Sequence, residues 1–240
     1  MTIKNANLLL LSSSRVGDTK YLEHALNMIK AKLNGITELL FVPYAGVTVN
    51  YDEYTQMVQN ALDAIGVKVT GIHQHEDPVA AVTNAKAIAV GGGNTFHLLH
   101  QLYKQNLIPA IQSKVATGMP YIGWSAGSNI AGLSIRTTND MPIIEPESFT
   151  ALNFVDFQLN PHYTDYNPPG HNGETRAQRL AEFMVLNPET PIVAIVEGTA
   201  LDLADNSLRL ACDSGSNSGY IFKAGDKSTI TTEDDLSNLL

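Results

Sequence analysis

The chain has 240 residues, of which 44% are hydrophobic and 16% charged, and its net charge is −9 at pH 7. This length can bury one full core, and the negative charge argues against nucleic acid or an anionic membrane as a partner. Cys212 is the only cysteine, which excludes an internal disulfide, and the apolar run at residues 8–11 is too short for a signal sequence or a membrane span. We therefore expect a cytoplasmic protein with a single domain, residues 1–240, acting as a monomer or homodimer.

Strands and helices are expected to alternate along the first half of the chain. Apolar residues at helical spacing predict a first helix at residues 20–32, which Asn34 and Gly35 close. The pattern predicts strands at residues 6–11, 38–42, 67–72 and 86–90, and further helices at 51–65, 78–84, 95–104 and 109–117. Such alternation is typical of a parallel sheet with right-handed crossovers.

The second half of the chain continues this pattern and then changes. A strand is predicted at residues 157–161, and the unbroken Val and Ile run at 191–196 is typical of a strand buried on both faces. Short strands at 200–203, 207–210 and 219–223 are expected to form an antiparallel edge. The predicted fold class is therefore α/β, with a doubly wound, mostly parallel sheet and helices on both faces.

A turn of the form G-x-S-x-G is the most informative motif. Gly123 and Gly127 flank Ser125, after a short apolar run and before a small-residue segment that could begin a helix. Such a strand–helix turn holds serine in a strained backbone and exposes its hydroxyl above the sheet. The motif predicts a nucleophilic serine, although the pentapeptide alone also fits an ordinary tight turn.

A serine nucleophile needs a base and a group that orients the base. His162 follows one predicted strand, and Glu197 ends another, so both are expected at the edge of the sheet where ligands bind. Asp140 is the rival for the third position, but a strand end fixes a carboxylate more firmly than a loop does. The order Ser, His, Glu departs from the order of the α/β-hydrolases.

Five motifs follow one another along the chain: Gly91 to Phe96, Gly123 to Asn129, Asn160 to His162, Gly173 to Arg176, and Glu197 with Gly198. Together they resemble the peptidase E family of aspartyl dipeptidases. The resemblance covers nearly the whole chain and implies a sheet related to that of class I glutamine amidotransferases. It also implies that Ser125 is the nucleophile, His162 the base and Glu197 its partner.

The loop of three glycines at residues 91–93 lies between a predicted strand and a helix. We expect it to form half of an oxyanion hole with the N–H of Ala126, and the resemblance assigns the loop's donor to Gly93. A phosphate-binding loop is the weaker reading, because the chain has no GxGxxG or GK[ST] pattern here. Asn94 or Thr95 is expected to cap the next helix, and Asn94 is also assigned to substrate binding.

Arg176 is the candidate for substrate specificity. It lies in the first turn of a helix predicted at residues 174–186, after a loop rich in proline and glycine. A guanidinium binds a carboxylate through two parallel hydrogen bonds, and the family resemblance places an arginine here that binds the aspartyl side chain. The alternative is an ion pair with Glu174 or Asp165. Arg179 and Arg136 are weaker candidates for the same role.

These observations predict a serine exopeptidase that hydrolyses dipeptides with an amino-terminal aspartate, so the expected partner is a small acidic peptide. Two alternatives remain open: a cyanophycinase-like serine hydrolase of β-aspartyl peptides, and a catalytically silent binding protein on the same fold. We expect no metal or other cofactor. His73 and His75 could approach a zinc ion, but no carboxylate or cysteine pattern accompanies them, and His97 and His100 are expected to be packing or surface residues.

Overall fold

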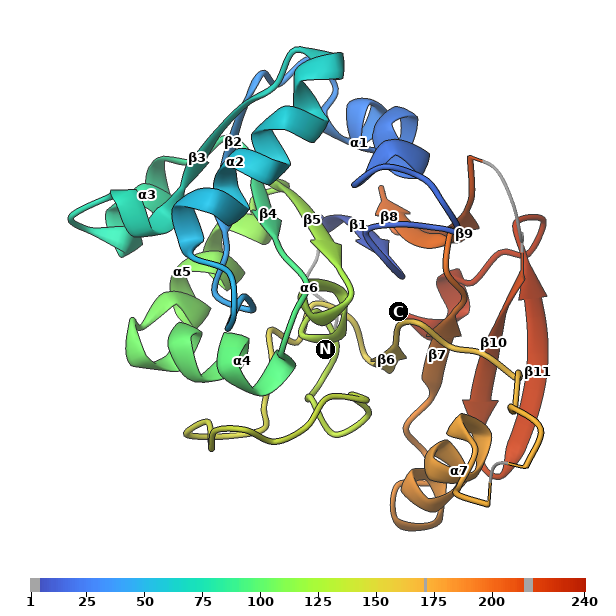
Figure 1. The fold of residues 1–240 in the computed structure, drawn as a ribbon. Coiled ribbons are helices and arrows are strands. Elements are labelled where there is room, and N and C mark those ends of the chain that lie inside the picture. Colours follow the sequence, from blue (N-terminus) through green and yellow to red (C-terminus); the bar gives the residue numbers. More distant parts are fainter. Residues whose placement is uncertain (1–4, 171, 214–217) are drawn as a thin grey trace.

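The computed structural model describes residues 5–170, 172–213 and 218–240. Its larger sheet has seven strands in the order β3-β2-β4-β5-β1-β8-β9 (Figure 1). The first five are mutually parallel, whereas β8 and β9 add an antiparallel edge next to β1. The strands are β1 (Asn7–Leu11), β2 (Glu38–Val42), β3 (Lys68–Gly71), β4 (Ile88–Val90), β5 (Pro120–Trp124), β8 (Ala200–Ala204) and β9 (Ser207–Ala211). The predicted α/β fold class is confirmed.

A second sheet of four strands has the order β11-β10-β7-β6 and stands beside the larger one in Figure 1. Its strands are β6 (Gln158–Asn160), β7 (Ile192–Ile195), β10 (Ser218–Lys223) and β11 (Asp226–Thr231). The strands predicted at residues 157–161, 191–196 and 219–223 therefore lie in this second sheet. Strands β6 and β7 are fully buried, and a buried apolar strand has the same pattern whichever neighbour it pairs with. The exposed and polar β11 was not predicted.

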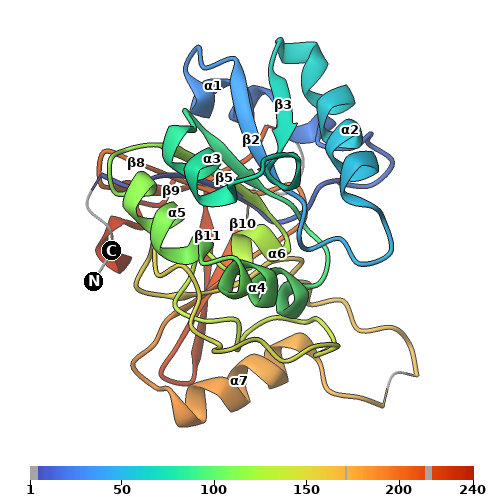
Figure 2. The ribbon, with the colours of Figure 1, turned by 90° about the vertical axis from the view of Figure 1, so that its left-hand side faces the viewer.

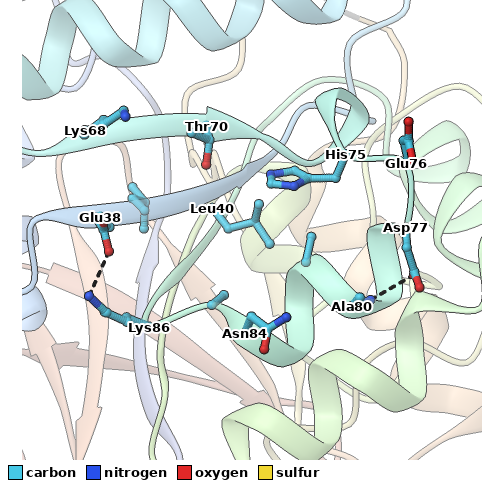
Figure 3. A pocket seen from close by; sticks show the side chains of 13 residues that line it. Glu38, Leu40, Lys68, Thr70, His75, Glu76, Asp77, Ala80, Asn84 and Lys86 are labelled. Carbon is cyan, nitrogen blue, oxygen red and sulfur yellow. Dashed lines mark hydrogen bonds and ion pairs between the residues drawn. The ribbon is translucent and has the colours of Figure 1, made fainter.

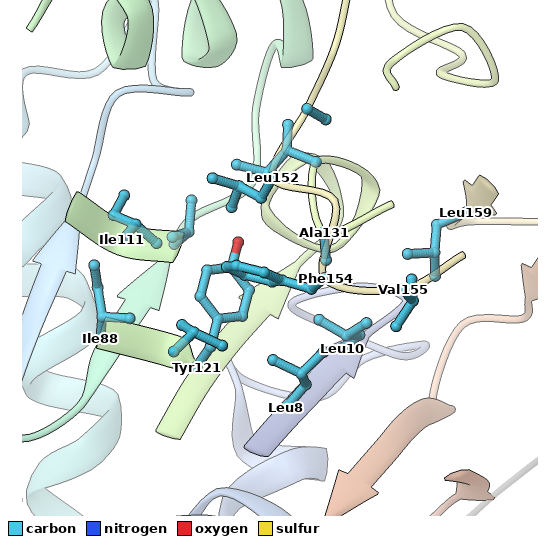
Figure 4. Packing of buried hydrophobic residues seen from close by; sticks show 14 of the residues in the cluster. Leu8, Leu10, Ile88, Ile111, Tyr121, Ala131, Leu152, Phe154, Val155 and Leu159 are labelled. Carbon is cyan, nitrogen blue, oxygen red and sulfur yellow. The ribbon is translucent and has the colours of Figure 1, made fainter. Parts of the chain in front are cut away.

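Helices cover both faces of the larger sheet (Figure 2). On β1, Leu9 and Leu11 pack on the side of α1 and α2, whereas Leu8 and Leu10 face the opposite side, in a core that α4 and α5 cover. Figure 4 shows Leu8 and Leu10 in that second core with Tyr121 and Phe154. The helices are α1 (Leu26–Leu33), α2 (Tyr51–Leu62), α3 (Pro78–Asn84), α4 (Thr95–Lys104), α5 (Leu107–Val115), α6 (Ala126–Asn129) and α7 (Arg176–Leu186).

Two helices begin later than the sequence predicts. The segment predicted as a helix from residue 20 has Leu22 in the left-handed region (φ 56°) and forms a 3-10 turn at Glu23–Ala25 before α1. Helix α7 begins at Arg176 instead of residue 174, because Thr175 and Gln178 form a capping box. Within the described ranges, every helix is too short or too polar to cross a membrane.

Candidate active site

The turn after β5 holds Ser125 in a strained conformation. Its backbone angles are φ 53° and ψ −113°, and α6 begins at the next residue. A Cβ atom built on Gly123 would lie 2.5 Å from the carbonyl oxygen of Gly127, and one on Gly127 would lie 2.1 Å from that of Val90. Only glycine fits at either place. The N–H of Ser125 donates to Leu11 O at 3.2 Å, so the turn is fixed at the carboxyl end of β1 and β5.

His162 and Glu197 come together at the end of the second sheet. Nδ1 of His162 lies 2.7 Å from Oε1 of Glu197. This contact leaves Nε2, on the other side of the imidazole ring, for a proton from a nucleophile. The Ser125 hydroxyl makes no hydrogen bond within the described part of the chain. No hydrogen bond therefore joins Ser125 to His162 among the described residues, and catalytic hydrogen bonds are often long in enzymes without substrate.

Ser12 connects His162 to both sheets. The N–H of His162, whose φ is 55°, donates to Ser12 Oγ at 2.9 Å, and this hydroxyl donates to Ile195 O at 2.8 Å. Ser12 is fully buried and follows β1 directly. Ser12 was not among the site residues predicted from the sequence. The available signal was three consecutive serines at the carboxyl end of a buried strand, which is the edge where ligands bind.

The glycine loop after β4 packs against the serine. A Cβ atom on Gly92 would lie 3.0 Å from Cβ of Ser125, and one on Gly93 (φ 136°) would lie 2.2 Å from Ala45 O. The N–H groups of Gly93 and Ala126 have no acceptor among the residues that the structure describes. Two free backbone donors beside a serine are the components of an oxyanion hole.

Asn94 and Asp140 stabilise the start of α4. Oδ1 of Asn94 accepts the N–H of His97 at 3.0 Å, and Nδ2 donates to Met141 O at 2.8 Å. The expected helix cap is thus confirmed as Asn94, whereas its substrate contact stays a prediction. Asp140 Oδ2 accepts the N–H and the hydroxyl of Thr95 at 2.7 and 2.5 Å. Of the two candidate carboxylates, Glu197 is therefore the one bonded to the imidazole.

The guanidinium of Arg176 pairs with neither Glu174 nor Asp165, the two carboxylates expected as alternatives from the sequence. Glu174 faces Arg179 at 3.7 Å, and Asp165 bonds to Lys227 at 2.6 Å. Nη1 of Arg176 is buried and has no hydrogen-bond partner among the described residues.

Several neighbouring charges act on the Arg176 guanidinium. Burial lowers the pKa of its guanidinium and Arg179 lowers it further, while the carboxylates of Glu197 and Asp140 act in the opposite direction. Arg136 is exposed. Arg176 is therefore a half-buried cation whose Nη1 has no partner among the described residues, and Glu197 is one of the charges that act on it.

Four other histidines, at positions 73, 75, 97 and 100, are not part of the His162–Glu197 pair. His73 bonds to Asp52 at 2.9 Å, whereas His97 and His100 bond to backbone carbonyls. His75 lines a cavity of about 440 Å³ between β2, β3 and α3, which Figure 3 shows with the Glu38–Lys86 ion pair at one end. Across the described ranges, no three His, Cys, Asp or Glu side chains are grouped so that they could hold a metal ion.

Comparisons with known proteins agree with one another. Residues 8–211 match the model of peptidase family S51. Peptidase E of Shewanella sp. (strain ANA-3) is 57% identical over 236 residues, which are 98% of each chain, and peptidase E of Shewanella denitrificans is 58% identical over 216 residues, 90% of this chain and 91% of that one.

Two solved structures share the fold. A putative peptidase E protein from Listeria monocytogenes superposes with a TM-score of 0.64 at 24% identity, covering 86% of this chain and 98% of its own. A peptidase from an acI-B1 actinobacterium superposes with a TM-score of 0.66 at 16% identity, covering 96% of each chain. At these identities the superpositions establish the fold alone.

Proposed function

Because this chain belongs to peptidase family S51 and is a peptidase, we propose that it is a serine exopeptidase that hydrolyses dipeptides with an amino-terminal aspartate. The observation that carries the serine mechanism is the His162–Glu197 pair, bonded at 2.7 Å, which Ser12 connects to the end of β1 next to the strained Ser125 turn. The relatives named peptidase E support the same reaction class.

The proposed reaction follows from the atoms of these residues. Ser125 Oγ attacks the carbonyl carbon after aspartate, while His162 Nε2 accepts the hydroxyl proton and then donates it to the leaving amine. Glu197 holds the Nδ1–H of the imidazole and stabilises its positive charge. The N–H groups of Gly93 and Ala126 bind the oxyanion of the tetrahedral intermediate. Water then hydrolyses the acyl-enzyme by the same proton transfers.

Specificity for aspartate is supported by Arg176. A buried guanidinium N–H without a partner is costly, and a substrate carboxylate would satisfy it. The protein carries a net charge of −9, so an acidic peptide needs a local cation to bind. Arg179 does not offer this, because it is exposed and faces Glu174.

A substrate panel tests the proposal directly. Purified protein is assayed with Asp-Leu, Glu-Leu, Asn-Leu, β-Asp-Leu and N-acetyl-Asp-Leu, and the Ser125→Ala variant serves as the control for contaminating peptidases. We expect turnover of Asp-Leu that the variant lacks, and little turnover of the other four peptides. Preferred cleavage of the β-aspartyl peptide would support a cyanophycinase-like hydrolase instead. No turnover of any peptide would support a binding protein.

A further inference from the structure

Tyr54 of α2 contacts the same peptide group that carries the proposed oxyanion donor. Its hydroxyl donates to the carbonyl oxygen of Gly92 at 2.9 Å. This carbonyl and the N–H of Gly93 belong to one planar trans peptide, in which C=O and N–H point in opposite directions. Fixing the direction of the Gly92 carbonyl therefore also fixes the direction of the Gly93 N–H.

This peptide needs such a constraint because glycine stands on both sides of it. Without Cβ atoms, Gly92 and Gly93 have wide conformational freedom, so a rotation of the intervening peptide meets little steric resistance. Such a rotation would turn the N–H away from the reacting carbonyl and present the Gly92 oxygen in its place, which would repel an oxyanion. The neighbouring bonds Gly91 N–H to Val42 O and Asn94 N–H to Ala45 O hold only the ends of the loop.

The direction of the Tyr54 hydrogen bond is set by a chain of donors. Trp124 Nε1, which can only donate, donates to Tyr21 Oη at 2.9 Å and lies 3.3 Å from Tyr54 Oη. The Tyr21 hydroxyl in turn donates to Tyr54 Oη at 3.1 Å. Tyr54 has one hydroxyl proton, and the carbonyl of Gly92 can only accept it. Hydrogen bonds arranged in one direction strengthen each other.

Tyr54 is held rigidly in this position. It is only 5% exposed and makes an edge-to-face contact with Phe41 at a centroid distance of 5.0 Å. A Cβ atom on Gly91 would lie 2.6 Å from Tyr54 Oη, so the hydroxyl comes this close only because residue 91 is glycine. Burial raises the pKa of the Tyr54 hydroxyl, which therefore keeps its proton at neutral pH.

We propose that Tyr54 is a positioning residue that holds the Gly92–Gly93 peptide with its N–H toward the oxyanion. This inference rests on the proposed serine mechanism. Trp124, the residue before the nucleophile, also belongs to the donor chain, so the same buried network contacts both sides of the reacting centre. Tyr54 itself does not touch the substrate in this role.

The test is Tyr54→Phe, which removes the hydroxyl and keeps the ring. Loss of an entire oxyanion donor lowers kcat by about a hundredfold to a thousandfold, and loss of its orientation should cost less, on the order of tenfold to a hundredfold. We expect KM for Asp-Leu to change by less than about twofold, because ground-state binding does not depend on this donor. The matched control is Tyr44→Phe, which removes another buried hydroxyl, bonded to Gln105 at 2.8 Å. The control should keep the wild-type kcat.

A second measurement separates positioning from a general loss of stability. The α-boronic acid analogue of aspartate forms a tetrahedral adduct with serine, so its inhibition constant should rise in Tyr54→Phe by about the same factor as kcat falls. Equal inhibition constants and equal kcat in wild type and Tyr54→Phe would overturn the inference. If Tyr54→Phe does not fold, Tyr21→Phe is tested in its place. We then expect a smaller loss of kcat, about threefold. An unchanged kcat in Tyr21→Phe would overturn the inference. A wild-type protein without activity on Asp-Leu would overturn the proposed function instead.

Discussion

Nδ1 of His162 and Oε1 of Glu197 are 2.7 Å apart because adjacent parallel strands carry the two residues to the same edge. Strands β6 and β7 pair in register, with Asn160 opposite Ala194, and each functional side chain follows shortly after its strand. The contact therefore depends on β6 and β7 being neighbours. It joins residues 35 positions apart in sequence.

The first prediction concerns the carboxylate. Replacing Glu197 by Gln puts an amide beside Nδ1 and favours the wrong imidazole tautomer, so we expect kcat for Asp-Leu to fall by about four orders of magnitude with little change in KM. Asp140→Asn is the matched control, since Asp140 bonds to Thr95. It should cause a much smaller loss of kcat. Steady-state kinetics of both variants decide the question, and the reverse ranking would give the third role to Asp140.

The second prediction concerns Ser125 and His162 acting as one unit. We expect Ser125→Ala and His162→Ala each to lower kcat by on the order of a millionfold, and the double variant to be little worse than either single one. Circular dichroism should show a folded protein in all three cases. A Ser125→Ala variant with more than about a tenth of wild-type activity would exclude the serine mechanism, because a tenfold loss corresponds to only ~1.4 kcal/mol.

The third prediction compares two arginines one helical turn apart. Arg176→Met should remove about 2–5 kcal/mol of transition-state stabilisation for Asp-Leu, because it removes one side of a partly desolvated charge pair. Arg179→Met should leave kcat/KM nearly unchanged, since Arg179 is exposed beside Glu174. Arg176→Lys should restore only part of the activity, because an ammonium lacks the planar fork.

The readout for the arginines is the ratio of kcat/KM for Asp-Leu to that for Asn-Leu. This ratio should fall in Arg176→Met and Arg176→Lys and stay at the wild-type value in Arg179→Met. A ratio that Arg176→Met leaves unchanged would mean that another residue recognises the aspartyl side chain.

The fourth prediction concerns stability and pH at His24. This residue, in the 3-10 turn before α1, is 6% exposed, and its two ring nitrogens have no partner in the described ranges. Burial lowers its pKa from 6.5, while Asp213 and Glu197 oppose the shift. The unfolded chain therefore binds a proton at a higher pH than the folded chain does, so His24 reduces the free energy of unfolding as the pH falls below about 6.5.

Replacing His24 by Leu removes this titration. The free energy of unfolding of His24→Leu, relative to wild type, should therefore be higher at pH 5 than at pH 8. Urea unfolding at the two pH values measures this difference. If the difference in the free energy of unfolding between His24→Leu and wild type does not vary with pH, His24 is not a buried neutral side chain.

Much of the local structure follows from the sequence alone. The alternation of apolar strands with helical spacing fixed the α/β class, and most strand limits agree with the structure within one or two residues. The G-x-S-x-G turn predicted a strained serine between a strand and a helix, and Ser125 has that conformation. These features depend on neighbouring residues, such as Gly123 and Gly127, so the local pattern contains the necessary information.

Tertiary structure alone decided which strands and side chains meet. Hydrophobic patterning made β6 and β7 buried strands but did not indicate that they leave the larger sheet, since burial does not specify a neighbour. Likewise, Glu197 and Asp140 were both possible partners of His162 until strand pairing brought one of them into contact. The bond between Tyr54 and Gly92 joins residues 38 positions apart. Such contacts depend on the packing of α2 against the sheet, which no local pattern encodes.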